Sequence, residues 1–150
     1  MTEFDKVIEC FKIMDFPPDI EEFEDRIIVQ KVIFLLKIKD IEFDYDFNLY
    51  LRGPYCPELT KDMFDYADKL KKLDSNIKFN NETIHQIKYL KYIITLDTSL
   101  LEIAATYAYF TEIEKVDSEK AIIKVKRLKH FISENKITKG IYKTKEYIQN

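Results

Sequence analysis

The sequence IIVQKVIFLLKI, residues 27–38, is the longest apolar-dominated run in the chain and is interrupted only by Gln30, Lys31 and Lys37. A buried parallel strand has a similar composition, but a run of this length favours a helix. Because apolar residues surround nearly the whole helix, we expect residues 26–37 to form a helix buried in the middle of the fold. The run is too short to cross the roughly 30 Å of bilayer hydrocarbon, so we expect no membrane association.

The composition of the 150-residue chain is typical of one folded domain. Hydrophobic residues make up 46% and charged residues 34%, which excludes an apolar-poor disordered chain. The acidic amino terminus lacks the basic start and apolar core of a secretory signal, so we expect a cytoplasmic protein. Cys10 and Cys56 lie far apart and outside any zinc-binding motif, and we expect both to be free thiols.

Helical periodicity continues along most of the chain on both sides of the central run. Apolar residues at helical spacing, capping residues and breaking prolines predict further helices. Their expected ranges are about 2–15, 57–73, 81–94, 100–113 and 118–132, with a last short helix over 138–148. We expect the small and apolar residues of 100–113 to pack closely against the central helix. The patterns predict a mostly α fold with a minor β part, a single-domain bundle of about six helices spanning residues 1–150.

The only clear β signal lies in the sequence FDYDFNLYLR, residues 43–52. Apolar or aromatic residues alternate there with polar ones, which is the period of a strand with one buried face. We expect one or two short strands, or a hairpin, near residues 43–52, ending at Gly53-Pro54.

The sequence LRGPYCPEL, residues 51–59, is the segment with the most specific composition. Gly53 permits a tight chain reversal, and Pro54 and Pro57 fix φ on either side of Tyr55. Proline suits the first position of a helix, and the glutamate that follows suits the positive helix start. We expect a rigid corner between a strand and a helix, which either only joins the two or presents side chains for binding at little entropic cost.

The chain resembles the Panacea-domain family in a series of motifs, in the order Arg26-x-x-x-Gln30-Lys31-x-x-x-Leu35, a short strand, then Gly53-Pro54-Tyr55-x-Pro57-Glu58-Leu59. That family has a Leu-Gln-Lys-Leu-x-Tyr type helix followed by a strand and a Gly-Pro-x-x-Pro corner, and it includes SocA-like antitoxins and YwgA-like proteins. The Gly-Pro-Tyr tripeptide and the later LEIAAT sequence, residues 101–106, are most similar to the YwgA-like members. The resemblance covers about residues 26–134.

The resemblance implies a mostly helical fold, no cofactor and, in some relatives, neutralisation of a toxin by direct binding. Gln30 and Lys31 match the family's Gln-Lys pair. We expect Gln30 to make buried hydrogen bonds to the strand or corner, and Lys31 to extend outward to solvent. The chain departs from the family where the tryptophan-bearing strand of other members is replaced here by residues 48–52, NLYLR.

The sequence contains no recognisable catalytic or metal-binding motif. His85 and His130 have mostly lysine neighbours and no partner at metal-ligand spacing. The only glycines, Gly53 and Gly140, exclude a glycine-rich phosphate loop. A metal-dependent hydrolase using clustered carboxylates has no motif behind it. We expect no metal, no cofactor and no catalytic residues.

The first functional hypothesis is a non-enzymatic protein-binding module, antitoxin-like or adaptor-like. Tyrosine and arginine contribute much of the energy at protein interfaces. The aromatic-rich surface near the corner predicts contacts through Tyr45, Tyr50, Arg52, Tyr55 and Tyr66. The partner would be a toxin, another protein or a second copy of the chain.

The alternative hypothesis is nucleic-acid binding by the basic segment 120–145. The chain has a net charge of −3, yet residues 1–25 carry nine acids against two lysines, and residues 120–145 carry nine Lys or Arg against Glu134 alone. Such asymmetry marks a phosphate-binding face, an internal pairing of the two ends, or two solvated faces. The candidate phosphate contacts are Lys124, Lys126, Arg127, Lys129, Lys136, Lys139 and Lys143.

Overall fold

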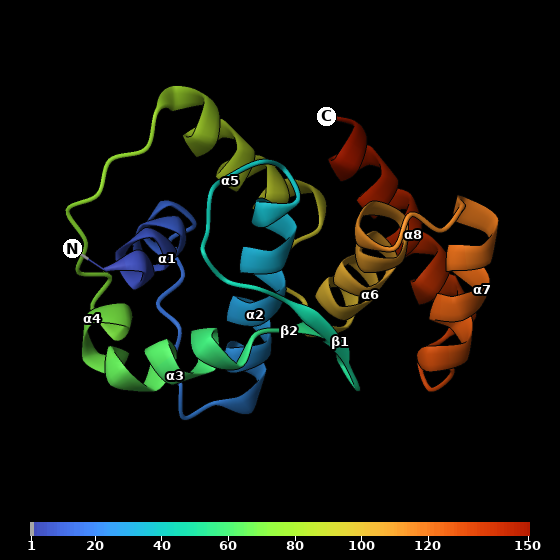
Figure 1. The fold of residues 1–150 in the computed structure, drawn as a ribbon, viewed down its shortest axis with the longest axis horizontal. Helices are drawn as coiled ribbons and strands as arrows, with labels where there is room; N and C mark the ends of the chain where they lie inside the picture. The colour runs from blue at the N-terminus through green and yellow to red at the C-terminus, as the bar shows by residue number, and fades with distance from the viewer. Residues whose placement is uncertain (1) are drawn as a thin grey trace.

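The computed structural model describes residues 2–150 and contains, in that range, eight α-helices, one π-helical segment and one two-stranded hairpin (Figure 1). The fold is therefore mostly α with a minor β part, as expected. The helices are α1 (Glu3–Ile13), α2 (Phe23–Lys37), α3 (Pro57–Asp65), α4 (Ala67–Lys71), α5 (Asn81–Ile93), α6 (Thr98–Ala108), α7 (Ser118–Leu128) and α8 (Glu134–Gln149). The π-helical segment η1 spans Tyr109–Ile113, and the strands are β1 (Asn48–Tyr50) and β2 (Gly53–Tyr55).

Helix α2 lies in the middle of the fold, with α1, α3 and α4 on one side and α6, α7 and α8 on the other (Figure 1). Every residue from Ile27 to Leu36 is buried, which confirms the expectation drawn from the apolar run. Helix α6 packs against α2 and α8, and its buried face includes Ala104, Ala105 and Ala108. Small side chains let these helices approach closely. No helix in residues 2–150 is long and apolar enough to span a membrane.

Side-chain caps begin four of the helices. Asp97 and Asp117 accept hydrogen bonds from backbone N–H groups in the first turns of α6 and α7, close to the predicted starts of these helices. Asn80, just before the helix predicted over 81–94, does the same for α5. Ser133 caps α8, so this helix begins at Glu134 instead of near Thr138 and is longer than expected.

The hairpin differs from the predicted strand in its position. Residues 43–47 carry no strand, whereas β2 starts at Gly53, where the strand was expected to end. The alternation is real, because Phe43 and Tyr45 insert into the core while their neighbours stay exposed. An extended segment of this kind has the strand period without a hydrogen-bonded partner. The partner strands are short and antiparallel, with Leu49 opposite Pro54.

The single helix predicted over 57–73 is two helices in the structure. The break is Tyr66, whose backbone angles, φ −116° and ψ 31°, are not helical. Its ring stacks on Phe4 of α1, with centroids 5.8 Å apart. Tyr66 therefore lies among packed side chains between α3 and α4.

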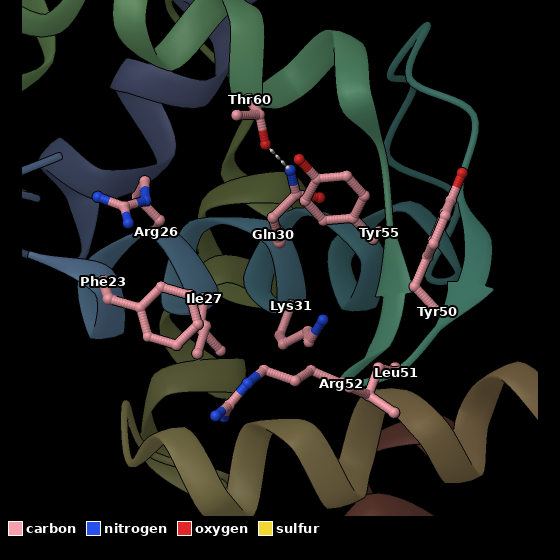
Figure 2. A pocket seen from close by; sticks show the side chains of 11 residues that line it. Phe23, Arg26, Ile27, Gln30, Lys31, Tyr50, Leu51, Arg52, Tyr55 and Thr60 are labelled. Carbon is pink, nitrogen blue, oxygen red and sulfur yellow. Dashed lines mark hydrogen bonds between the residues drawn. The ribbon is translucent and has the colours of Figure 1, made fainter.

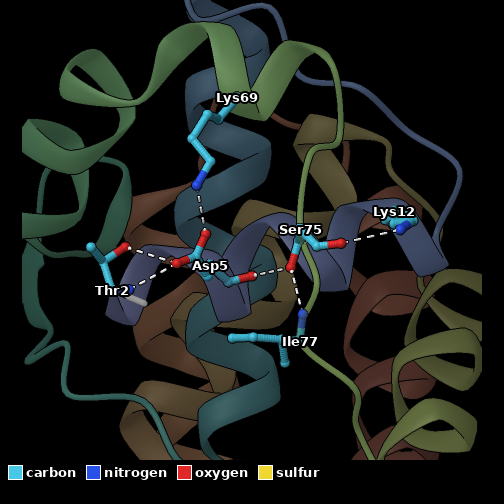
Figure 3. Close-up of polar contacts among 6 residues, drawn as sticks. All are labelled: Thr2, Asp5, Lys12, Lys69, Ser75 and Ile77. Atoms are coloured by element: carbon cyan, nitrogen blue, oxygen red, sulfur yellow. Dashed lines mark hydrogen bonds and ion pairs between the residues drawn. The ribbon is translucent and has the colours of Figure 1, made fainter.

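A polar network ties α1 to α4 and to the loop before α5 (Figure 3). Asp5 accepts from the backbone N–H of Thr2 at 2.8 Å and pairs with Lys69 at 3.0 Å. The Ser75 hydroxyl donates to the Asp5 carbonyl, and Lys12 donates to the Ser75 carbonyl. Burial raises the pKa of the Asp5 carboxyl, but the hydrogen bonds from Thr2 and Lys69 outweigh burial and hold the pKa below its ordinary value.

Candidate functional site

Gln30 fixes the corner between the hairpin and α3 to the central helix. Its side-chain N–H donates to the Cys56 carbonyl at 2.9 Å, and its side-chain oxygen accepts from the Cys56 N–H at 2.9 Å. The same amide nitrogen also donates to the Thr60 hydroxyl at 2.9 Å. This confirms the predicted buried hydrogen bonding of Gln30 to the corner. These two hydrogen bonds to the backbone of Cys56 hold the start of α3 in a single register on α2.

Gly53 allows the hairpin to lie close to α2 and α6. Its φ is +112°, and a Cβ built there would lie 2.7 Å from the Thr106 hydroxyl of α6. Underneath, the Lys31 ammonium donates to the Pro54 carbonyl at 2.8 Å. The expectation that Lys31 extends outward is wrong, since only 2% of the residue is exposed. The hairpin covers it and supplies a backbone acceptor.

The two prolines and the glutamate of the corner motif shape the hairpin and the start of α3. Pro54 is buried in β2, and Pro57 is the first residue of α3, as the sequence predicted. Glu58 follows in the first turn of α3 and is exposed. A carboxylate there stabilises the helix start without contacting the pocket described next.

A pocket of about 350 Å³, here called the corner pocket, opens between α2, the hairpin and α3 (Figure 2). Three of its lining residues are cationic and none is acidic. Its lining consists of Phe23, Arg26, Ile27, Gln30, Lys31, Tyr50, Leu51, Arg52, Gly53, Tyr55 and Thr60. The corner pocket therefore combines an apolar wall with several hydrogen-bond donors, which is the usual make-up of a ligand site.

Aromatic rings and guanidinium groups stack along the rim of the corner pocket. The Phe23 ring lies between two cations, with the guanidinium of Arg26 at 5.5 Å and that of Arg52 at 5.0 Å from its centroid. Tyr50 and Tyr55 meet edge to face across the hairpin, with centroids 5.3 Å apart. Such contacts hold the long arginine side chains against the Phe23 ring (Figure 2).

A charge cluster with a buried carboxylate lies behind the hairpin. The Glu102 carboxylate of α6 contacts the Arg52 guanidinium at 3.4 Å and the Lys129 ammonium at 3.6 Å. Burial, with a smaller contribution from the charges of Lys129 and Arg52, lowers the pKa of Lys31 to about 8 against the opposing effect of Glu102. Burial likewise lowers the pKa of Lys129. Two cations thus contact one carboxylate, and the buried Lys31 feels the same charges.

The structure brings together three of the predicted protein-binding residues and separates the others. Tyr50, Arg52 and Tyr55 all line the corner pocket. Tyr66 lies away from it on Phe4, as described above. Tyr45 is buried, and its hydroxyl donates to Asp62 at 2.6 Å, so it belongs to the core.

Several site residues were missed from the sequence. Phe23 and Ile27 were not singled out, and Arg26 was named only in the motif with Gln30 and Lys31. These five residues recur at helical spacing and form one face of α2. Polar residues on one face of an otherwise apolar helix were the available signal, but the helix was expected to begin only at residue 26. A second signal was Glu102, the one charged residue of α6, which lies among small and apolar residues and so indicated a buried charge.

The predicted phosphate contacts of the basic segment 120–145 divide into ion-paired, buried and unpaired residues. Lys124, Lys126 and Lys136 pair with Glu114, Glu134 and Asp97, at 3.8, 3.0 and 3.4 Å. The remaining four predicted contacts divide into one buried residue, Lys129, and three that form no ion pair with residues 2–150, namely Arg127, Lys139 and Lys143.

The prediction that Lys129 contacts phosphate is wrong. Only 1% of it is exposed, because its ammonium turns inward to Glu102. A side chain in that position cannot contact a phosphate at the surface.

Comparisons of the chain with protein-family models, with curated proteins and with solved structures found no match. Within residues 2–150, no group of three or more His, Cys, Asp or Glu side chains is arranged to hold a metal ion. Cys10 and Cys56 are free and buried. The geometry of the corner pocket is accordingly the basis for interpreting function.

Proposed function

We propose that the protein is a non-enzymatic binding module that recognises a protein partner through the corner surface, defined as Phe23, Tyr50, Leu51, Arg52 and Tyr55. The observation that carries the proposal is the hairpin tip, where Leu51 is 93% exposed beside an open pocket. A large apolar side chain so exposed loses contact with water when a partner covers it, which favours association.

The composition and rigidity of the corner surface support a protein partner. Tyrosine and arginine are enriched among the residues that dominate interface energies. Gln30 and Lys31 hold the hairpin from below, so the surface loses little conformational entropy on binding. Two exposed aromatic rings, Phe23 and Tyr50, stand on either side of the pocket mouth (Figure 2).

The resemblance to Panacea-domain proteins supports the same direction of inference. Some members of that family neutralise a toxin by direct binding, so an antitoxin-like or adaptor-like role is the specific form that we propose. The motif residues that carry the resemblance, among them Gln30 and Gly53, are the ones that build the corner. A second copy of the chain is a partner of the same kind.

Nucleic-acid binding is the second candidate function. Arg127, Lys139 and Lys143, which form no ion pair with residues 2–150, favour it. The ion pairs of the other surface lysines reduce the charge that phosphates would meet, since each paired lysine already has a counterion. We therefore rank it below protein binding.

Affinity capture from an extract of the native host tests the proposal with matched variants. The tagged wild-type protein, Leu51→Ser and Tyr92→Ser are compared after nuclease treatment and a high-salt wash. Tyr92 is the control because it is 78% exposed on α5, outside the corner surface. We expect a protein retained by the wild type and Tyr92→Ser but not by Leu51→Ser. Equal capture by all three, or material lost to nuclease and salt alone, contradicts the proposal.

A further inference from the structure

We infer that the corner pocket recognises an acidic peptide segment of the partner, holding one carboxylate at the Arg52 guanidinium while a neighbouring apolar side chain packs at the hairpin tip. This inference rests on the proposed function and specifies the chemistry of the partner.

Charge is the first argument. The chain has a net charge of −3, yet the lining of the corner pocket contains three cations and no Asp or Glu. A concave site with one sign of charge concentrates ions of the opposite sign. The pocket is thus complementary to an anion, although the protein as a whole is not.

Unused donors are the second argument. A guanidinium carries five N–H donors and an ammonium three. Arg26 uses one of them on the Ile20 carbonyl, Arg52 one on Glu102, and Lys31 one on the Pro54 carbonyl. Lys31 is buried beneath the hairpin, so the free donors at the surface are those of the arginines, and the half-exposed Arg52 guanidinium offers a carboxylate strong charge-assisted hydrogen bonds (Figure 2).

The buried cluster is the third argument. Glu102 is the carboxylate shared by Arg52 and Lys129, and the buried Lys129 ammonium has no hydrogen-bond partner among residues 2–150. An excess of buried positive charge is costly, because desolvation disfavours charged groups that lack counterions. An anion in the corner pocket adds the missing negative charge beside Arg52 and Lys31.

The surroundings of the pocket favour one carboxylate over a polyanion. Glu22 and Glu24 precede and follow Phe23 in the sequence and are exposed. Their charges oppose a polyanion more strongly than a single carboxylate, because the repulsion grows with the charge of the ligand. The apolar part of the wall, including Ile27 and Leu51, suits a hydrophobic residue next to that acid.

Selection from a random-peptide display library tests the inference. The library is selected on the full-length wild-type protein and on Arg52→Gln, with Arg127→Gln as the control for removing an exposed arginine elsewhere. Thermal unfolding of each variant establishes that it is folded. Selected peptides are then synthesised with Asp or Glu and with the matching Asn or Gln, and their affinities are measured, with a single-stranded oligonucleotide as competitor.

We expect wild-type peptides that pair Asp or Glu with an apolar neighbour, an affinity at least about tenfold weaker for the amide peptides and for Arg52→Gln, and no change for Arg127→Gln. Peptides that bind at the corner surface but show no dependence on an acid overturn the inference and leave the proposed function standing. If the oligonucleotide displaces the peptides from the pocket and the peptides show no sequence preference, both the inference and the proposed function are overturned.

Discussion

The corner and the basic segment 120–145 use the same kinds of side chain in opposite ways. At the corner, lysine and glutamine lie beneath the backbone and fix it, as Lys31 does at the Pro54 carbonyl. Along α7 and α8, lysines such as Lys136 lie at the surface and pair with single acids. Buried polar groups hold a conformation because leaving them unpaired is costly, whereas solvated pairs contribute little. The density of charged residues in the sequence therefore pointed to the segment 120–145 and not to the corner, where the polar groups are buried and hydrogen-bonded.

The largest effect is expected where the hairpin meets α6. Gly53→Ala combines a φ of +112° with a Cβ 2.7 Å from the Thr106 hydroxyl. We expect the free energy of unfolding to fall by about 3 kcal/mol, measured by urea denaturation. Adding Thr106→Ala relieves the clash but not the backbone strain, so the double variant recovers only part of the loss. Full recovery, or a single variant as stable as the wild type, contradicts this view of the corner.

Gln30→Leu is expected to have the next largest effect. It leaves the Cys56 N–H and carbonyl without their buried partner. We expect a loss of about 2–3 kcal/mol in the free energy of unfolding. Gln149→Leu, at an exposed position near the end of α8, is the matched control and should change stability by less than about 0.5 kcal/mol. Similar losses in both variants would show that Gln30 is not an anchor.

The buried ammonium of Lys31 predicts a pH dependence that Lys31→Met removes. The pKa of Lys31 is about 8 in the folded chain and 10.5 ordinarily, so between these values the unfolded chain binds a proton that the folded chain does not. Stability contributed by this group therefore rises with pH over that window. From pH 8 to 10, wild type should gain on the order of 2 kcal/mol relative to Lys31→Met in urea denaturation. A constant difference between the two proteins would contradict a buried, shifted lysine.

Asp5→Asn tests the polar network outside both regions. The folded pKa of Asp5 lies below the ordinary 3.8, so its stabilisation is present above that value and is lost as the pH falls through the folded pKa. At pH 7 we expect a loss of about 1 kcal/mol, since Lys69 is partly screened by solvent. The difference should shrink in thermal unfolding near pH 3. A difference that grows in acid would have the wrong sign.

The smallest effect is expected in the basic segment. Lys136→Gln removes an exposed ion pair with Asp97 and should change the free energy of unfolding by less than about 0.5 kcal/mol at moderate salt. Thermal unfolding at low and high salt provides the check. A loss as large as that of Gln30→Leu would remove the distinction between the two regions.

Much of the fold follows from local signals in the sequence. The apolar run placed α2 in the core, and Asp97 and Asp117 marked helix starts because their side chains cap locally. The strand over 43–52 was misplaced because inward-facing Phe43 and Tyr45 alternate like a strand without a partner. Local pattern reports which side chains point inward, not whether a neighbouring strand is present.

The candidate site was only partly predictable. Arg52 and Tyr55 stood out because the corner sequence is rigid, but their neighbours Phe23 and Arg26 come from a separate segment. The burial of Lys31 depends on the hairpin folding back over α2, a long-range contact that helical spacing does not report. The sequence thus indicated the hairpin side of the pocket, and the α2 side follows only from long-range packing.

Amide hydrogen exchange of the protein with and without its captured partner tests the central claim most directly. We expect slower exchange at residues 23–31 and 48–60, which form the corner pocket and its support, and no change over 120–145. Protection confined to residues 120–145, with the hairpin unchanged, would contradict the claim that the corner is the binding surface.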